Sequence, residues 1–207
     1  MVTGSIILAT ALLLGETCEV VFKQSAYMAY PDRRNDAEES YMNKLATAAC
    51  KTKDPDIIWF IVSTESAFRF RVIRINGTRK MLTGDKAISY LQNLKRHSNS
   101  KRISNVDIGA MQFNYYWHNA TFSRDPIRML DPSRQVAYFV KVFKPSIVRR
   151  CGQGWVGCYH NSRNHVRAKA YKTLIAQSKT LLSQRAKEYQ GTNLQRNTSG
   201  NYAMENN

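Results

Sequence analysis

Residues 54–66 read DPDIIWFIVSTES, a short polar start followed by a run of apolar residues. Asp54 suits the N-cap of a helix, and Pro55 suits its first helical position. The apolar residues that recur at the spacing of one buried helix face are Ile57, Ile58, Ile61 and Val62. The stretch therefore predicts a buried helix that ends near Glu65.

Glu65 would bring its carboxyl group out of this helix at an apolar wall. Desolvation there disfavours the charged form and raises the pKa. A carboxylic acid that stays protonated can donate a proton to a leaving oxygen, as cleavage of a glycosidic bond requires. The alternative is a surface Glu at a helix end, and this stretch alone does not decide between the two.

The rest of the chain predicts a mainly α protein of the α+β class with one small β-hairpin. The hairpin combines strand formers over 70–75, the turn dipeptide Asn76-Gly77 and a second extended run over 78–82. Helices are predicted over 37–50, 86–94, 155–160 and 165–188, and two more between 127 and 148 with a break near 131–132. Residues 23–37 are mixed and polar, and they predict an arm.

The sequence is predicted to consist of three parts: an N-terminal segment, a domain and a C-terminal tail. Residues 1–22 are predicted to be a signal peptide or N-terminal apolar segment, because the uncharged run 6–14 has the length of a signal core and is too short to span a bilayer. A buried N-terminal helix is the alternative. Residues 23–188 form the predicted domain, and 189–207 a disordered polar tail. We expect an exported, periplasmic protein whose mature form has no transmembrane anchor.

The four cysteines are compatible with export, where disulfides form. Cys151 and Cys158 flank a predicted turn and could face each other. Removal of a signal peptide after Cys18 would leave an odd number of cysteines, so the pairing stays open. No Cys-x-x-Cys pair exists, which argues against a structural zinc site, and no metal or cofactor is expected.

The formal net charge is +16, with 31 Lys and Arg against 15 Asp and Glu. Such a charge favours an anionic partner, either nucleic acid, anionic lipid or an acidic cell-wall polymer, although it could also serve solubility alone. The basic residues are scattered through all segments and form no stripe with aromatic residues, so nucleic acid is the weakest candidate.

Two later segments add to Glu65. Residues 107–114 read DIGAMQFN, in which Gly109 permits a close backbone approach, Met111 an adaptable apolar surface and Gln112 a donor and an acceptor. Residues 155–161 read WVGCYHN, in which Tyr159 offers a hydroxyl group that could hold a carboxyl in position. Each segment alone is equally typical of a core.

In this order the three segments resemble the lytic transglycosylases with a goose-type lysozyme fold. That family has Glu-Ser at a helix end, then Gly-Leu-Met-Gln, then Ala-Tyr-Asn-Ala-Gly. The resemblance covers residues 37–171, and the hairpin and residues 105–109 are similar to the members that serve type IV secretion systems. The chain departs from the pattern at Ala110, which replaces Leu, and at His160, which stands where Asn is usual.

The resemblance implies a lysozyme-like helical domain in which Glu65 is the catalytic acid and base. It also implies that Tyr159 hydrogen-bonds the Glu65 carboxyl. The substrate-binding residues that it implies are Ser66, Gly109, Met111, Gln112, Tyr159, His160 and Asn161. The expected partners are peptidoglycan glycan strands and envelope subunits of a secretion system, with no nucleic acid.

We take the three motifs to hold a single catalytic carboxylate, whereas glycoside hydrolases generally use two. The expected reaction is therefore lytic: cleavage of the MurNAc–GlcNAc β-1,4 bond with formation of 1,6-anhydromuramic ends, which would open the wall for a secretion machine. The alternatives are a muramidase that cleaves the same bond with water and an inactive wall-binding scaffold subunit.

Overall fold

A computed structural model describes residues 17–78, 80–96, 105–122, 124–160 and 164–204. The α-helices in these residues are α2 (Cys18–Ala29), α3 (Asp36–Cys50), α4 (Pro55–Ser66), α5 (Gly84–Arg96), α6 (Tyr115–His118), α7 (Pro132–Tyr138), α8 (Lys144–Cys151), α9 (Trp155–His160) and α10 (His165–Met204). The strands are β1 (Val72–Ile75), β2 (Met81–Thr83), β3 (Val106–Ile108) and β4 (Phe113–Asn114). The mainly α class with a small antiparallel sheet is confirmed.

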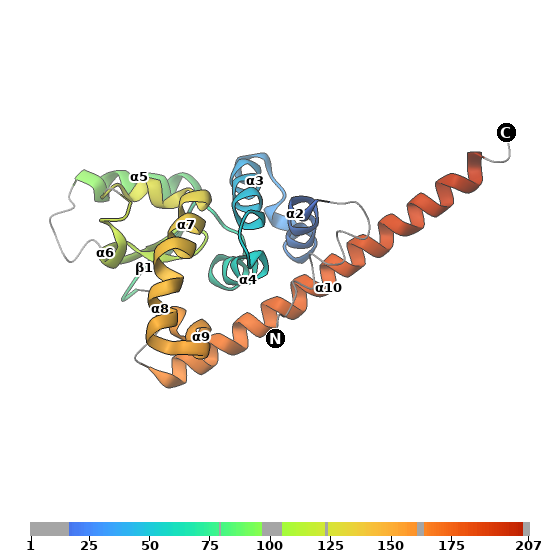
Figure 1. Ribbon diagram of the computed structural model, residues 1–207. Helices are drawn as coiled ribbons and strands as arrows, with labels where there is room; N and C mark the ends of the chain where they lie inside the picture. The colour runs from blue at the N-terminus through green and yellow to red at the C-terminus, as the bar shows by residue number, and fades with distance from the viewer. Residues whose placement is uncertain (1–16, 79, 97–104, 123, 161–163, 205–207) are drawn as a thin grey trace.

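Helix α4 lies in the middle of the molecule, between α3, α10 and the segment that leads to the sheet (Figure 1). It begins as the sequence predicts, with Asp54 at the N-cap and Pro55 at the first position. The Trp59 ring stacks on Phe22 of α2 at 4.8 Å and contacts Phe68 at 4.9 Å. The residues of α4 with buried side chains are Pro55, Ile58, Trp59, Phe60, Ile61, Val62, Ser63 and Ser66.

The predicted hairpin is present, and it belongs to a larger sheet. Strand β1 pairs antiparallel with β2, and Gly77 takes a positive φ of 78° in the turn between them. In the described residues the sheet has the order β2-β1-β3-β4, with Arg74 of β1 opposite Asp107 of β3. Strands β3 and β4 come from the DIGAMQFN segment and its approach, which the sequence did not predict as strands. The sheet therefore brings this segment beside β1.

Residues 18–29 form a helix, so the predicted arm over 23–37 is wrong over its first part. Val21, Phe22 and Ala26 of α2 are fully buried. A disulfide between Cys18 and Cys50 joins the start of α2 to the end of α3. The arm was predicted because polar and apolar residues alternate irregularly here, whereas tertiary packing against α3, α4 and α10 decides the structure. Residues 1–16, including the predicted signal core, lie outside the described part.

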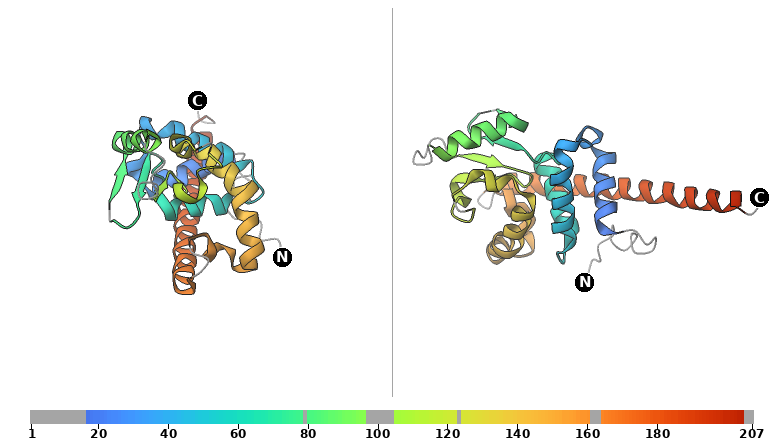
Figure 2. Two further views of the ribbon diagram at one scale, coloured as in Figure 1. Left: turned by 90° about the vertical axis from the view of Figure 1, so that its left-hand side faces the viewer. Right: turned by 90° about the horizontal axis from the view of Figure 1, so that it is seen from above.

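Helix α10 is the longest element and runs diagonally under the molecule, then extends beyond it (Figures 1 and 2). The helix packs on α9, α4 and α2, with Ile175, Leu182 and Ala186 buried. The helix begins where the sequence predicts, but it continues to Met204, whereas the sequence predicts a disordered tail from 189.

After a short 3-10 helix, η2 (Pro126–Leu130), residues 132–151 form a nearly continuous helical rod. Helix α7 starts at Pro132, close to the predicted break, and joins α8 through a π-helical turn, η3 (Phe139–Phe143). A second disulfide links Cys151 at the end of α8 to Cys158 in α9. This pair closes the turn that directs α9 and the start of α10 towards the end of α4.

Candidate functional site

A cavity of about 300 Å³ opens at the C-terminal end of α4. Its walls come from α4, from strand β1, from the end of α9 and from the start of α10, elements that approach one another in Figure 1. The residues that line it are Thr64, Glu65, Arg74, His160, Arg167, Ala170, Tyr171 and Leu174. Glu65 is the only carboxylate in this lining of described residues.

Glu65 is half-buried, and its Oε1 atom is inaccessible to solvent and has no hydrogen-bond partner among the described residues. Burial raises the pKa of the carboxyl from 4.5 to about 7. The Tyr171 hydroxyl and the Arg74 charge lower this pKa, and the Asp107 charge raises it further. Because burial is the largest of these effects, Glu65 is divided between its acid and carboxylate forms near neutral pH.

The hydroxyl group that faces the Glu65 carboxyl belongs to Tyr171. The prediction that the Tyr159 hydroxyl hydrogen-bonds this carboxyl is wrong. The Tyr159 hydroxyl donates to the Met111 carbonyl oxygen at 2.7 Å. Tyr171 is only 3% exposed, and although its hydroxyl is close enough to lower the Glu65 pKa, the two groups do not reach hydrogen-bonding geometry. The Tyr171 ring stacks on Tyr159 at 5.7 Å and on His160 at 5.4 Å, which fixes it in place.

Five of the predicted substrate-binding residues do not line the cavity: Ser66, Gly109, Met111, Gln112 and Tyr159. Ser66 is buried, and its hydroxyl donates to the Val62 carbonyl oxygen. Met111 is fully buried, and Gln112 is nearly so, with its Nε2 donating to the Gly109 carbonyl oxygen. Tyr159 is partly buried behind Tyr171. Of the remaining predicted residues, His160 lines the cavity, and Asn161 lies outside the described residues.

The DIGAMQFN segment is anchored by Gln135 of α7, which is fully buried. Gln135 Oε1 accepts from the Met111 backbone N–H at 2.9 Å, and its Nε2 donates to the carbonyl oxygens of Ile108 and Met129 at 2.8 and 2.7 Å. Gly109 has a φ of 76°, and a Cβ there would overlap Gln135 Nε2 and lie 2.7 Å from the Met129 oxygen. Gly109 is therefore required for packing, whereas the family resemblance implies that it binds substrate.

Backbone strain is concentrated next to Glu65 and Gln112. Ala67, Phe68 and Gln112 all have φ values between 50° and 57°, in the left-handed region that residues other than Gly rarely adopt. The Phe68 ring is fully buried, and Arg33 Nε donates to the Ala67 carbonyl oxygen at 3.0 Å. Such strain persists only where the surroundings enforce it, and it often marks functional sites.

Asp107 is a second acidic residue near Glu65. It stands in the DIGAMQFN segment, so Glu65 is not the only acidic residue in the three motifs. Its Oδ1 accepts from Asn76 Nδ2 and Asn114 Nδ2, both at 2.9 Å. Its charge raises the pKa of Glu65, of Tyr159 and of His160. Asp107 does not line the cavity, but it belongs to the electrostatic environment of Glu65.

Sequence reasoning missed most of the cavity wall. Tyr171 and Leu174, which is half-exposed in the cavity, lie in the predicted helix 165–188 and were not predicted as site residues. Arg74 and Arg167 were counted only in the net charge. One signal was available for Arg74, because an Arg interrupts the apolar strand that directly follows the Glu65 helix. The positions on α10 depend on how this helix crosses α4, which no local pattern fixes.

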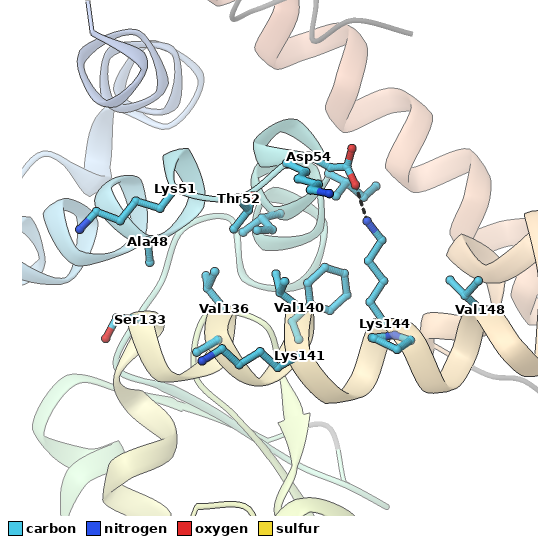
Figure 3. A pocket seen from close by; sticks show the side chains of 16 residues that line it. Ala48, Lys51, Thr52, Asp54, Ser133, Val136, Val140, Lys141, Lys144 and Val148 are labelled. Carbon is cyan, nitrogen blue, oxygen red and sulfur yellow. Dashed lines mark hydrogen bonds and ion pairs between the residues drawn. The ribbon is translucent and has the colours of Figure 1, made fainter. Parts of the chain in front are cut away.

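A larger cavity of about 570 Å³ lies elsewhere, between the end of α3, the start of α4 and the α7–α8 rod. Figure 3 shows its floor of aliphatic side chains, including Val136, Val140 and Val148, with Lys51 and Lys141 at its border. Lys144 reaches across it to Asp54 at 2.5 Å. This cavity contains none of the predicted site residues, and its lining offers apolar contact without a buried acid or nucleophile.

Within the described residues, no group of three or more His, Cys, Asp or Glu side chains is arranged to hold a metal ion. The helices of that part of the chain also include none with both the length and the apolar character needed to cross a bilayer.

Comparison with known proteins found no match to this chain among protein-family models, curated proteins or solved structures.

Proposed function

We propose that this chain is a peptidoglycan lytic transglycosylase that cleaves the MurNAc–GlcNAc β-1,4 bond. The observation that supports the proposal most is Glu65, a half-buried carboxyl with a pKa of about 7 in the lining of an open cavity. A general acid that must also act as a base works best when its pKa is near the working pH. Local cleavage of the wall would make room for the assembly of a secretion machine.

In the proposed reaction, Glu65 in its acid form donates its proton to the bridging oxygen as the C1–O bond breaks. The resulting carboxylate then accepts the proton of the muramoyl 6-hydroxyl, whose oxygen bonds to C1 and closes the 1,6-anhydro ring. Glu65 ends the cycle protonated, so one carboxyl group is sufficient and no water is consumed. Tyr171 and the strained turn at 67–68 would keep the carboxyl oriented towards the cavity.

Action on peptidoglycan requires export from the cytoplasm. The pairing of Cys18 with Cys50 and of Cys151 with Cys158 supports this, because such bonds persist in oxidising compartments. The net charge of +16 suits a polymer that carries carboxylates. The proposed location is the periplasm, and the proposed partners are glycan strands and secretion-system envelope subunits.

Asp107 favours one alternative, a muramidase that cleaves the same bond with water. A hydrolase generally needs a second carboxylate to activate or orient the water. Asp107 is close enough to act on the Glu65 pKa, although its Oδ1 is already engaged by Asn76 and Asn114. Because of these bonds we place the lytic reaction first.

The deciding experiment is digestion of purified sacculi with the oxidised, full-length protein, followed by mass spectrometry of the released muropeptides. The lytic proposal requires anhydromuramic ends, which are lighter by one water than reducing ends. Reducing ends would select the muramidase. Glu65→Gln is the matched control, and it should release neither product. If the wild-type protein binds sacculi without cleaving them, the remaining interpretation is an inactive scaffold subunit.

A further inference from the structure

Two guanidinium groups line the same cavity as Glu65, and the proposed reaction assigns neither a role. Arg74 comes from β1 and is half-buried, whereas Arg167 comes from the first turn of α10 and is exposed. Burial lowers the pKa of His160, which lines the same cavity, and both arginine charges lower it further; the Arg74 charge also lowers the pKa of Glu65. The positive charge of the two residues is therefore directed into this one space.

Neither Arg74 nor Arg167 forms a salt bridge with any carboxylate among the described residues. Arg71, on the neighbouring segment, pairs with Glu38 and Asp85 at 3.0 and 3.3 Å. Asp107 faces Arg74 across the β1–β3 pair, but the hydrogen bonds to its Oδ1 come from Asn76 and Asn114. Within the described part of the chain, both guanidinium groups therefore lack a carboxylate partner.

A second observation points to a ligand in the same cavity. The Tyr171 hydroxyl and Glu65 Oε1 are both buried without a hydrogen-bond partner among the described residues. A buried polar atom without a partner costs free energy unless a ligand or water satisfies it. The cavity therefore combines two unpaired guanidinium groups with two unsatisfied polar atoms, an arrangement that an anionic, hydroxyl-bearing ligand would complete.

We propose that Arg74 and Arg167 form a carboxylate-binding subsite that holds the acidic 3-O substituent of the muramoyl unit being cleaved. The inference rests on the proposed function, and it adds the feature of the glycan that is recognised. Arginine suits this task because its planar fork matches the two oxygens of a carboxylate. The carboxylate can come from the free lactyl group of a strand without peptides or from the peptide stem, in which the lactyl group is an amide.

Binding is measured by titration calorimetry in the Glu65→Gln background, so that no cleavage occurs. The probes are a GlcNAc–MurNAc disaccharide with a free lactyl acid, the same disaccharide with a lactyl carboxamide, and a disaccharide carrying a tetrapeptide stem. Arg74→Gln and Arg167→Gln are each added to this background. Lys169→Gln is the matched control, since it removes one charge from α10 at a residue that lines a different cavity.

Each arginine substitution should weaken binding of the preferred acidic probe roughly tenfold, as expected for loss of one charge-assisted contact, and should leave the carboxamide probe unchanged. Lys169→Gln should change neither. Preference for the free lactyl acid or for the tetrapeptide probe identifies which carboxylate is bound. Thermal unfolding checks that Arg74→Gln is folded, and the exposed Arg167 provides a second variant that does not depend on the sheet.

If neither the free lactyl acid nor the tetrapeptide probe bound more tightly than the carboxamide probe, the subsite would be overturned, as it would by an equal loss in Lys169→Gln or by no binding of any probe. These outcomes can be told apart from a failure of the proposed function. That failure is read from wild-type protein on sacculi, where cleavage products are absent whatever the probes show. If the wild-type protein cleaves sacculi but the arginine variants bind the acidic probes normally, the proposed function is retained and the subsite is rejected.

Discussion

The Tyr159 hydroxyl donates a 2.7 Å hydrogen bond to the Met111 carbonyl oxygen, and this bond joins α9 to the segment that lies beside Glu65. Tyr171, one ring further along the stack, faces the carboxyl instead. The two hydroxyl groups therefore have separable roles. One supports the backbone around the site, and the other acts on the acid.

Tyr159→Phe and Tyr171→Phe should differ in their effects. Tyr159→Phe leaves the Met111 carbonyl without its partner and should lower the free energy of unfolding by about 1 to 2 kcal/mol. Tyr171→Phe should change stability less, because its hydroxyl already lacks a partner, but it should move the upper pH limit of cleavage upwards, since this hydroxyl lowers the Glu65 pKa. Thermal unfolding and pH–rate profiles of both variants provide the comparison. If Tyr159→Phe moved the pH limit and Tyr171→Phe lowered stability, the hydroxyl that acts on Glu65 would be that of Tyr159, as the sequence predicts.

Glu65→Gln should abolish cleavage and stabilise the fold in a pH-dependent way. The pKa in the fold, about 7, lies above the 4.5 of the free group, so the native state binds more protons between these values. Wild-type stability from this group is therefore greatest below pH 4.5 and is lost as pH rises through 7. Gln carries no charge, so the variant should be more stable above pH 7, by up to about 3 kcal/mol, and equal to wild type near pH 4. Denaturant unfolding at the two pH values measures this difference, and a variant less stable at both would contradict the buried acid.

The upper pH limit of cleavage should shift in opposite directions when the two charges near Glu65 are removed. The Asp107 charge raises the Glu65 pKa, so Asp107→Asn should lower the pH at which activity falls. The Arg74 charge lowers that pKa, so Arg74→Gln should raise it. Asn at 107 keeps an oxygen that can accept from Asn76 and Asn114, which preserves the local contacts. Shifts of the same sign, measured on a soluble glycan, would mean that the limit reports another group.

Gly109 and Gln135 should behave as one packing unit. Gly109→Ala should destabilise the protein more than Gly84→Ala, because both positions have positive φ but only Gly109 has atoms within reach of a new Cβ. Gln135→Ala removes three hydrogen bonds to backbone groups and should cost at least about 2 kcal/mol. In a Gln135→Ala background the cost of Gly109→Ala should shrink, since one overlapping atom is gone. Additive costs in the unfolding measurements would argue against direct contact.

The parts of the fold that follow from local pattern were predictable. Helix α4 has both a start signal at Asp54-Pro55 and a helical apolar period, and the β1–β2 turn has Asn76-Gly77. Strands β3 and β4 are only three and two residues long, too short for a period to be visible. Their existence depends on pairing with β1, which is a long-range interaction.

The candidate site was predictable at Glu65 and only in part elsewhere. The motif containing Gly109, Met111 and Gln112 is joined to the cavity wall through Tyr159, which bonds Met111 and stacks on Tyr171, but it does not line the cavity itself. The wall itself includes Arg74, Arg167 and Tyr171, which meet because α10 crosses the end of α4. A crossing of two helices distant in sequence has no local signature, so Arg167 and Tyr171 of α10 could be found only in the folded chain.

The mature protein should retain Cys18, which narrows the range of positions at which the mature chain can begin. The sequence places the start of the mature chain near residues 18 to 23. In the structure, however, Cys18 is paired with Cys50, and Val21 and Phe22 are fully buried in the core. Removal of these residues would leave Cys50 unpaired and open a cavity beside Trp59, on which Phe22 stacks; loss of one buried Phe side chain costs about 3 to 5 kcal/mol. We therefore expect cleavage before Cys18, in protein without free thiols. N-terminal sequencing and thiol titration of protein from the native cell measure both quantities, and Cys50→Ser, with one free thiol, calibrates the titration. A stable mature chain that starts after Phe22 would show that α2 is dispensable and would overturn this expectation.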